Sequence, residues 1–333
     1  MKHIPYITVI FFLNIIFIGC ERPEKEIPIN ENIIALPESL SLNNALWIND
    51  STIFYPLGYY TITDNFNQIA DHIITRKFYE RVVMQDHIDD KILWVYNRPI
   101  SGGSSQLVLN EYSRTTGETT AICDDERITG ARYYRDSEHI IYHMYSRTEE
   151  NQMLSGFYLY DRGSNTKEIL LLDTNSPPSR DWTNVRGFDI HPEENKLLTL
   201  GSNYNLIEYN IDLKQIDTLD ISFPARKTGG VPLHLWLRYN NSGNRVLYSH
   251  YNYATNNEWG ESEVGILNML TNEKRILDVN TNTKGKSVNI FPDWSPDNRH
   301  IVYGSGAIDH KYFTKTTPLP PMPELFILKN VDY

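Results

Sequence analysis

The sequence predicts an all-β protein, a six-bladed β-propeller of four-stranded antiparallel blades, preceded by a signal peptide and a tether. Three observations lead to this expectation. A hairpin pattern recurs along the chain, a second pair of strand-like segments trails it, and the composition is rich in residues that favour strands. The 333 residues include 22 Tyr, and aromatic residues make up 12%, which favours β structure over helix bundles.

The clearest hairpin lies near the end of the chain, between Phe291 and Ser305. Its turn is Pro296-Asp297-Asn298, in which Pro fixes φ at a central position and Asp and Asn can hydrogen-bond their own backbone. The strand-like run Ile301-Val302-Tyr303 follows, and Gly304-Ser305 ends it. A single hairpin is marginally stable alone, so the importance of this one depends on its recurrence.

Weaker copies of the hairpin recur along the chain, each with a short apolar run after a polar turn. The central residues of the six runs are Ile53, Leu93, Ile141, Leu198, Leu247 and Val302. The steps between these positions are 40, 48, 57, 49 and 55 residues. Such periods are in the range of a four-stranded propeller blade with variable loops.

A second hairpin trails the first, as in the pair formed by Phe157–Tyr160 and Lys167–Leu171. Four antiparallel strands cannot bury both faces alone, whereas radial stacking of such units buries them and leaves short edges. A solenoid would require a more constant period and capping units, and a β-sandwich would not repeat the motif six times. The expected blades lie near residues 39–80, 81–126, 127–178, 179–224, 225–284 and 285–333.

The last unit contains only three strand candidates, of which the third is Glu324–Val331. The segment from Ile33 to Leu42 could supply the fourth strand and so pair the two ends of the ring. The blade count has an uncertainty of one, because the first unit is a degenerate copy of the repeat.

The N-terminal residues 1–19 have the pattern of a signal peptide. A short basic start precedes a mostly apolar run that is shorter than the roughly 20 residues of a spanning helix, and the run ends at Gly19-Cys20. A small residue directly before Cys resembles a bacterial lipobox, which implies cleavage before Cys20 and lipidation of its thiol. An ordinary signal peptide and an uncleaved anchor are the alternatives. Residues 20–38 are polar, charged and Pro-containing, and are expected to form a flexible tether.

The motif Trp294-Ser295-Pro296-Asp297, followed by Ile301-Val302-Tyr303, resembles the WD-like repeat of TolB-type propellers. A similar repeat is found in the propeller of prolyl-oligopeptidase relatives. The resemblance covers roughly residues 40–333 as architecture and implies a binding scaffold, often periplasmic. It carries over no catalytic residue, because the repeat motif is structural. On this basis Asp293, Trp294 and Asp297 are interpreted as part of a structural turn.

In a propeller, the connections between blades and the loops between second and third strands share one face, here called the loop face. The long polar loops of this chain fall there, and loops on a rigid scaffold usually carry function. The candidate binding residues are Tyr251, Tyr253, Trp259 and Glu261 in one loop, His310 and Tyr312 in a second, and Trp182 in a third. The alternative interpretation is that these side chains only pack their loops onto neighbouring blades or cover a blade edge.

The sequence lacks the common signatures of catalysis. No G-x-S-x-G elbow or H-E-x-x-H motif is present, and no catalytic residue, metal site or cofactor is predicted. The net charge of −11 argues against nucleic acid as a partner. The expected function is that of a lipid-anchored envelope protein of the outer membrane that binds a protein, peptide or glycan. The alternatives are a propeller-type hydrolase or lyase, with convergent His, Glu or Asp at the mouth of the central channel, and a purely structural envelope component.

Overall fold

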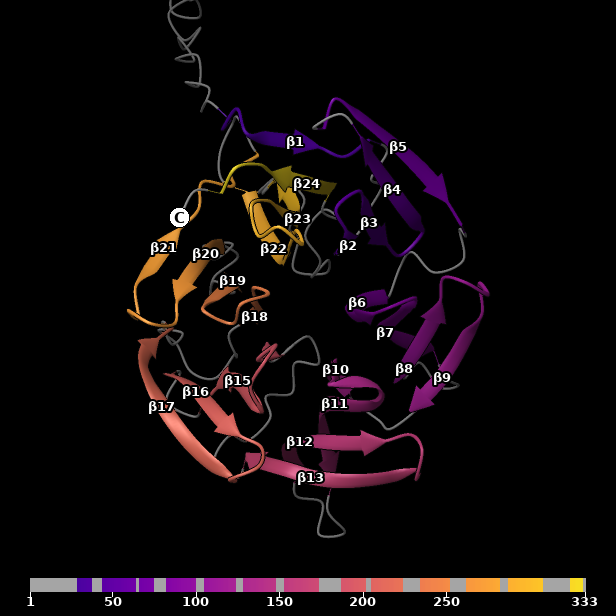
Figure 1. The fold of residues 1–333 in the computed structure, drawn as a ribbon, viewed down its shortest axis with the longest axis vertical. Coiled ribbons are helices and arrows are strands. Elements are labelled where there is room, and N and C mark those ends of the chain that lie inside the picture. The colour runs from indigo at the N-terminus through magenta and orange to yellow at the C-terminus, as the bar shows by residue number, and fades with distance from the viewer. Residues whose placement is uncertain are drawn as a thin grey trace, which may run out of the picture.

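The computed structural model describes residues 29–37, 44–63, 66–74, 82–99, 105–123, 128–147, 153–173, 187–201, 205–223, 234–251, 262–281, 287–307 and 324–331. These residues form 24 strands in six four-stranded sheets. The sheets are arranged as blades around a central axis (Figure 1). The predicted fold class, an all-β protein with six four-stranded antiparallel propeller blades, is confirmed.

Five blades are built from four consecutive strands each. Blade 1 contains β2 (Leu46–Asn49), β3 (Thr52–Tyr55), β4 (Gly58–Thr63) and β5 (Gln68–Ile73), and blade 2 contains β6 (Val82–Ile88), β7 (Lys91–Pro99), β8 (Ser105–Ser113) and β9 (Thr119–Cys123). Blade 3 contains β10 (Ile128–Tyr134), β11 (Asp136–Arg147), β12 (Met153–Asp161) and β13 (Thr166–Asp173), and blade 4 contains β14 (Phe188–Ile190), β15 (Lys196–Leu200), β16 (Asn205–Asn210) and β17 (Gln215–Ser222). Blade 5 contains β18 (His234–Tyr239), β19 (Arg245–Tyr251), β20 (Ser262–Asn268) and β21 (Lys274–Ile276).

Blade 6 is closed by the N-terminal segment. It contains β22 (Ser287–Trp294), β23 (Ile301–Ala307) and β24 (Glu324–Leu328), with β1 (Ile33–Ala35) as its fourth strand. β1 pairs antiparallel with β24, and the backbone N–H of Leu36 donates a further hydrogen bond to the carbonyl of Leu325 at 2.9 Å. The prediction that residues 33–42 supply a ring-closing strand is therefore confirmed for Ile33–Ala35.

The predicted extent of the tether, residues 20–38, is wrong at its C-terminal end. Ile33–Ala35 form a strand, and the side chain of Leu36 is only 4% exposed. The physical reason is the open edge of β24, which presents backbone groups that need partners. The apolar run from Ile33 to Leu36 satisfies this edge and packs on it, so it belongs to the propeller.

The hydrophobic core lies between neighbouring blades and follows the sequence repeat. The six residues aligned at the centre of the second strands are all fully buried. They are Ile53, Leu93, Ile141, Leu198, Leu247 and Val302, each with 0% exposure. The buried clusters mix side chains of adjacent blades, as where Leu198 of blade 4 packs in one cluster with Leu237 of blade 5. Radial stacking therefore provides the burial that one blade lacks.

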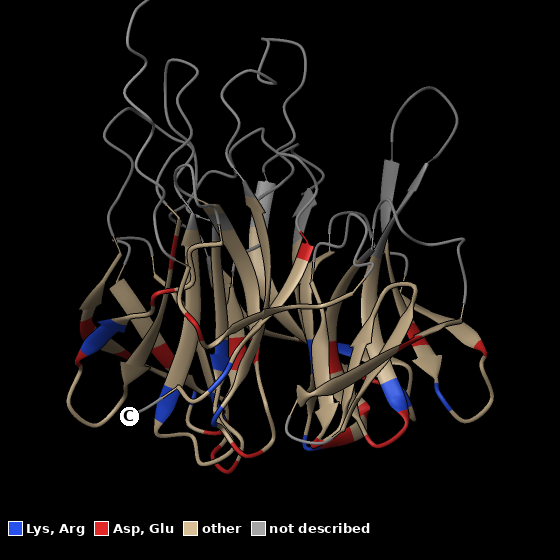
Figure 2. Cartoon of the chain, turned by 90° about the horizontal axis from the view of Figure 1, so that it is seen from above, with Lys and Arg blue, Asp and Glu red and all other residues tan. Residues whose placement is uncertain are grey.

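The antiparallel order of each blade defines two faces. The turns between first and second strands, and between third and fourth strands, lie together at one face, here called the turn face (Figure 2). Several of these turns use residues that tolerate a left-handed backbone, such as Asn165, Asn272 and Asn298 with φ of 54°, 59° and 59°. Among the described residues, no helix is both long and apolar enough to cross a membrane.

Candidate functional site

The candidate residues of the loop face lie almost entirely outside the described residues. Tyr251 is the last residue of β19, where its backbone pairs with His234 and Ser262. The remaining candidates are outside the described part of the chain: Tyr253, Trp259, Glu261, His310, Tyr312 and Trp182. Cys20 is also outside it. These residues therefore keep the status of predictions.

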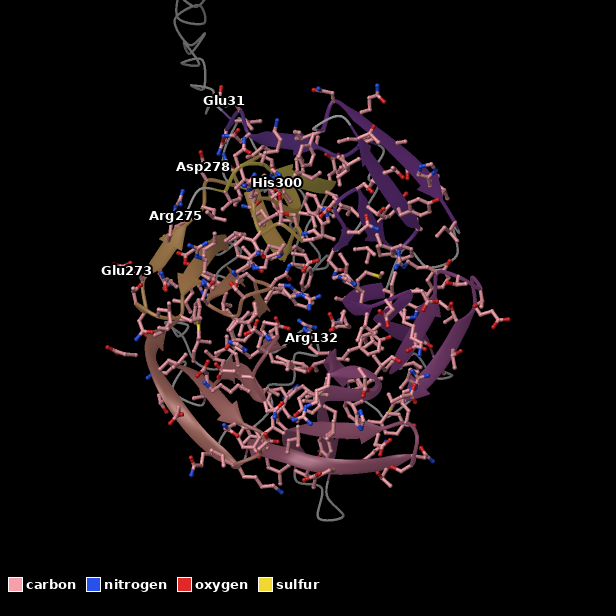
Figure 3. The ribbon with its side chains drawn as sticks, in the orientation of Figure 1. Glu31, Arg132, Glu273, Arg275, Asp278 and His300 are labelled. Atoms are coloured by element: carbon pink, nitrogen blue, oxygen red, sulfur yellow. The ribbon has the colours of Figure 1, made fainter. Side chains whose placement is uncertain are left out.

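The described residues enclose a cavity at the opposite end of the central channel, at the turn face. Its volume is about 500 Å³, and the first strands of all six blades contribute to its walls. The first strands of blades 2 to 6 each add one charged side chain to the lining, with alternating sign: Asp86, Arg132, Asp189, Arg238 and Asp293. Arg135, which follows β10, also lines the cavity. Figure 3 shows Arg132 near the centre of the ring of blades. This space is called the turn-face cavity below.

The three carboxylates occupy equivalent positions in blades 2, 4 and 6. Asp86, Asp189 and Asp293 each pair across the blade with one of the aligned core residues, Leu93, Leu198 and Val302. Each also accepts a hydrogen bond from a backbone N–H on the first strand of the next blade. The donors are Tyr133 to Asp86 at 2.8 Å, Tyr239 to Asp189 at 2.6 Å, and Trp47 to Asp293 at 2.8 Å. The carboxylates therefore join the blades in pairs, including the pair that closes the ring.

The two guanidinium groups come from blades 3 and 5 and lie between the carboxylates. Arg132 Nε donates to Asp189 at 2.8 Å, and its Nη1 donates to the carbonyls of Gln85 and Ala131. Arg238 reaches across the channel, and its Nη1 lies 3.2 Å from Asp86 and 3.6 Å from Asp189. Its Nε lies 3.2 Å from Asp293 Oδ1, which is an ion-pair distance, but the geometry does not make a hydrogen bond.

The ring repeats every two blades. Blades 2 and 3 supply Asp86 and Arg132, and blades 4 and 5 supply Asp189 and Arg238. Blades 6 and 1 supply Asp293 but no Arg from the first strand. In blades 3 and 5 the backbone N–H that holds the carboxylate belongs to a Tyr preceded by Arg, whereas in blade 1 it belongs to Trp47, which is preceded by Leu46. The tyrosine hydroxyls donate to carboxylates of the preceding blade, from Tyr133 to Glu111 at 2.8 Å and from Tyr239 to Glu208 at 3.0 Å. Ile327 stands at the corresponding position of blade 6. Trp47 has no hydroxyl, so a buried carboxylate at position 327 would lack a hydrogen-bond donor. Ile327 avoids the free-energy cost of such an unsatisfied group.

Burial and the neighbouring charges shift the pKa values of Arg132, Arg238 and Asp189 in opposing directions. Burial lowers the pKa of Arg132 to about 10, so this side chain is still cationic at neutral pH. Burial alone would also lower the pKa of Arg238, but the carboxylates of Asp293, Asp86 and Asp189 outweigh burial and raise it. Burial raises the pKa of Asp189 against the attraction of both guanidinium groups. Burial likewise lowers the pKa of His87, which keeps its imidazole neutral at pH 7.

The arrangement suits structure and binding better than acid–base chemistry. Each carboxylate of the ring already holds a backbone N–H and a guanidinium group, so none is free to take a proton from a substrate. Within the described part of the chain, no group of three or more His, Cys, Asp or Glu side chains could hold a metal ion. The turn containing Asp297 is structural, as predicted, because its Oδ1 accepts from Ser295 Oγ and from the backbone N–H of Arg299. Asp293, by contrast, lies on β22 and belongs to the channel ring.

The ring was not predicted from the sequence, although the sequence contains a signal for it. Four of its five members stand nine residues before the second-strand residue with which they pair, as in Asp189 with Leu198 and Arg132 with Ile141. Asp86 stands seven residues before Leu93. A charge at a fixed offset inside an otherwise apolar strand, alternating in sign between blades, is the signal that identifies the ring.

Neither protein-family models nor curated proteins match this chain. Among solved structures, the β-propeller domain of Cps50 (Swd1) from Myceliophteria thermophila is similar with a TM-score of 0.51 and 10% identity, covering 89% of this chain and 99% of that chain. Oligogalacturonate lyase from Vibrio parahaemolyticus matches with a TM-score of 0.44 and 10% identity over 85% and 76% of the two chains. The β-propeller domain of the Trilobed protease from Pyrococcus furiosus matches with a TM-score of 0.40 and 10% identity over 76% and 70%. At such identities, the likeness to the Cps50 domain shows the propeller fold alone.

Proposed function

We propose that this protein is a lipid-anchored binding protein of the bacterial cell envelope, held at the outer membrane through Cys20. Its TolB-like propeller binds a protein, peptide or glycan partner at the loop face. The lipobox-like Gly19-Cys20 supports the proposed membrane anchor, and the WD-like motif at Trp294–Asp297 supports the proposed TolB-like family. The loops that contain Tyr253 and Tyr312 offer aromatic and polar side chains suited to such a partner.

One observation favours a binding function over catalysis: the channel carboxylates already take part in hydrogen bonds and ion pairs within the protein. A propeller-type hydrolase or lyase would need an acid–base group that reaches substrate at the channel mouth. At the turn-face mouth, Asp86, Asp189 and Asp293 are each held by a backbone N–H and lie within ion-pair distance of Arg238. A scaffold whose channel side chains are held by hydrogen bonds and ion pairs between blades is suited to presenting a rigid face.

Affinity capture from envelope extract tests the proposed partner. The soluble protein used as bait must begin before residue 33, because β1 closes the ring. We expect a specific partner to be retained by the wild type and lost when Tyr253 and Trp259 are both changed to Ala, because stacking side chains dominate such contacts. The control is Leu270→Ala, at an 81% exposed residue of a turn between β20 and β21. Retention of the partner by the double variant, or turnover of a screened substrate with no partner found, contradicts the proposal.

The lipid anchor has a separate test based on the two cysteines of the chain. Cys20→Ser is expected to move most of the protein from the membrane fraction to the soluble fraction, since it removes the acylated thiol. Cys123→Ser is the matched control, because Cys123 is a buried cysteine at the end of β9. Fractionation followed by mass measurement of the N-terminal peptide checks both variants. If Cys20→Ser leaves the amount of protein in the membrane fraction unchanged, the proposed lipid anchor is wrong.

A further inference from the structure

Two buried side chains of the turn-face cavity carry hydrogen-bond donors that find no acceptor in the protein. Trp47 and Arg238 line the cavity and are only 2% and 5% exposed. In the described part of the chain, Trp47 Nε1 and Arg238 Nε have no hydrogen-bond partner. A buried donor without an acceptor is unfavourable. Both atoms therefore favour a ligand that brings acceptor oxygens into the cavity.

An acceptor atom lies beside one of these donors. Asp293 accepts the backbone N–H of Trp47 through Oδ2 at 2.8 Å, whereas its Oδ1 accepts no hydrogen bond from the described residues. Arg238 Nε lies 3.2 Å from this Oδ1 without forming a hydrogen bond to it. A hydroxyl group can accept from Nε and donate to Oδ1 at the same time, whereas a carbonyl oxygen can only accept. This pair of atoms therefore favours a hydroxyl group over a carbonyl group.

His87 adds a further polar side chain to the cavity wall. Its imidazole makes no hydrogen bond within the described part of the chain. Burial lowers the pKa of His87, so the ring is neutral at pH 7 and carries one donor and one acceptor nitrogen. Asp86, the preceding residue, lies 3.2 Å from Arg238 Nη1. His87 is therefore grouped with Trp47 and Asp293 around Arg238, and the group offers hydrogen bonds to several hydroxyl groups of one ligand.

The charges of the cavity favour a neutral ligand. Three carboxylates and three guanidinium groups belong to its described lining: Asp86, Asp189, Asp293, Arg132, Arg135 and Arg238. Their formal charges cancel. An anionic ligand would meet the carboxylate of Asp293, and a cationic ligand would meet the guanidinium group of Arg238, so either would be repelled by part of the group.

The shape and the remaining lining of the cavity suit a ring-shaped ligand with an apolar face. The volume of about 500 Å³ is in the range of small-molecule sites. Large aromatic side chains contribute to the walls, among them Trp47, Trp294, Tyr133 and Tyr239. Aromatic rings offer apolar surface together with a polar edge, which is the combination that a sugar ring requires.

We propose that the turn-face cavity binds a neutral sugar, with Trp47 and Arg238 donating to its hydroxyl groups and Asp293 accepting from one of them. A serine or threonine side chain of a peptide brings a single hydroxyl group and satisfies only one of these positions. A pyranose ring brings several hydroxyl groups and an apolar face. This site goes beyond the proposed partner interaction, which uses the opposite face of the propeller.

Saturation-transfer NMR with the full-length protein, in a detergent without a sugar headgroup, tests the site. The probes are glucose, galactose and mannose, and the matched controls are the uronate and the 2-amino form of each, which keep the ring and add a charge. We expect at least one neutral sugar to bind, and its two charged forms to bind at least about tenfold more weakly. If none of the three binds at about 10 mM, the unpartnered atoms hold ordered water only and the proposal is wrong. Equal binding of the neutral and charged forms also overturns it.

Two substitutions then locate the binding. Trp47→Phe removes the indole N–H but keeps an aromatic ring and the backbone N–H that holds Asp293, and is expected to weaken binding about fivefold, as for loss of one hydrogen bond. His87→Phe removes both ring nitrogens and is expected to weaken binding by a similar factor. Trp94→Phe and His72→Phe make the same changes outside the cavity lining and should bind like the wild type. Thermal melting confirms that each variant is folded. Folded Trp47→Phe and His87→Phe proteins that both bind like the wild type contradict the site.

Failure of this site and failure of the proposed function are distinguishable. A protein that binds none of the sugars but still captures an envelope partner through Tyr253 and Trp259 refutes only the cavity site. Sugar binding that is lost when Tyr253 and Trp259 are changed to Ala, and is unaffected by Trp47→Phe, belongs to the loop face and also refutes the cavity site. Sugar binding that Trp47→Phe weakens, in a protein that captures no partner, refutes only the proposed function.

Discussion

Deletion of residues 33–42 is expected to destabilise the whole propeller by about 5 kcal/mol, through lost hydrogen bonds and lost apolar burial. The deletion removes β1 from β24, together with the bond from the N–H of Leu36 to the carbonyl of Leu325. It also removes the side chain of Leu36, which packs in a cluster with residues of blades 1 and 6 such as Tyr60 and Leu325. The exposed edge of β24 would then be open to pairing with other chains.

Differential scanning calorimetry of the deleted and intact proteins measures the effect. The melting temperature of the transition is expected to fall by roughly 8 °C for a domain of about 300 residues. Two single substitutions test the packing of this segment without removing the chain. Leu36→Ala should cost about 2–3 kcal/mol because it leaves a cavity, whereas Ala35→Ser, at an exposed position of the same strand, should be near neutral. An unchanged transition in the deleted protein would mean that ring closure does not depend on β1.

The fold was accessible from the sequence because its signal is local and repeated. Each of the six second strands combines an apolar run with a preceding polar turn, and the structure buries the central residue of every one, from Ile53 to Val302. The closing strand was also accessible, since Ile33 to Leu36 is an apolar run close in sequence to the first blade. Its boundary was not, because the flanking residues are polar and only the edge of β24 decides where pairing begins.

The channel ring was not found because it is a long-range feature. Asp86 and Arg238 are separated by 152 positions and meet only when blades 2 and 5 face one another across the channel. In the linear sequence, each is a single charge in an apolar strand, which is usually interpreted as a solvent-facing position. The equivalence of Arg132 and Arg238 becomes visible once the strand pairs are known, since each pairs with the central residue of its second strand. The loop-face residues could be chosen only by composition, so they remain predictions.

Arg238→Met is expected to destabilise the protein by about 3–5 kcal/mol at pH 7, as for removal of one partner of a buried ion pair. Arg238 is 5% exposed and lies within ion-pair distance of Asp86, Asp189 and Asp293. Met retains much of the apolar volume and offers no charge, so the loss is chiefly electrostatic. Urea unfolding followed by circular dichroism measures the change. The control is Arg135→Met, an exposed residue 3.7 Å from Asp212, for which about 0–1 kcal/mol is expected.

The pH dependence of this loss distinguishes unpaired carboxylates from poor packing. Burial already raises the pKa of Asp189 above its ordinary value in the wild type, against the attraction of Arg132 and Arg238, and removal of Arg238 should raise it further, because one of its two neighbouring guanidinium groups is lost. A carboxyl with a raised pKa in the folded state contributes stability that is present below its unfolded pKa and is lost as the pH rises through its folded pKa. The deficit of Arg238→Met relative to the wild type should therefore be largest near neutral pH and shrink as the pH falls toward about 4, where unfolded Asp begins to protonate. Carboxylates that are hydrogen-bonded elsewhere, such as Asp297, are present in both proteins and cancel in this difference. A deficit that stays constant from neutral pH down to about 4 would assign the loss to packing and would remove the electrostatic role given to Arg238.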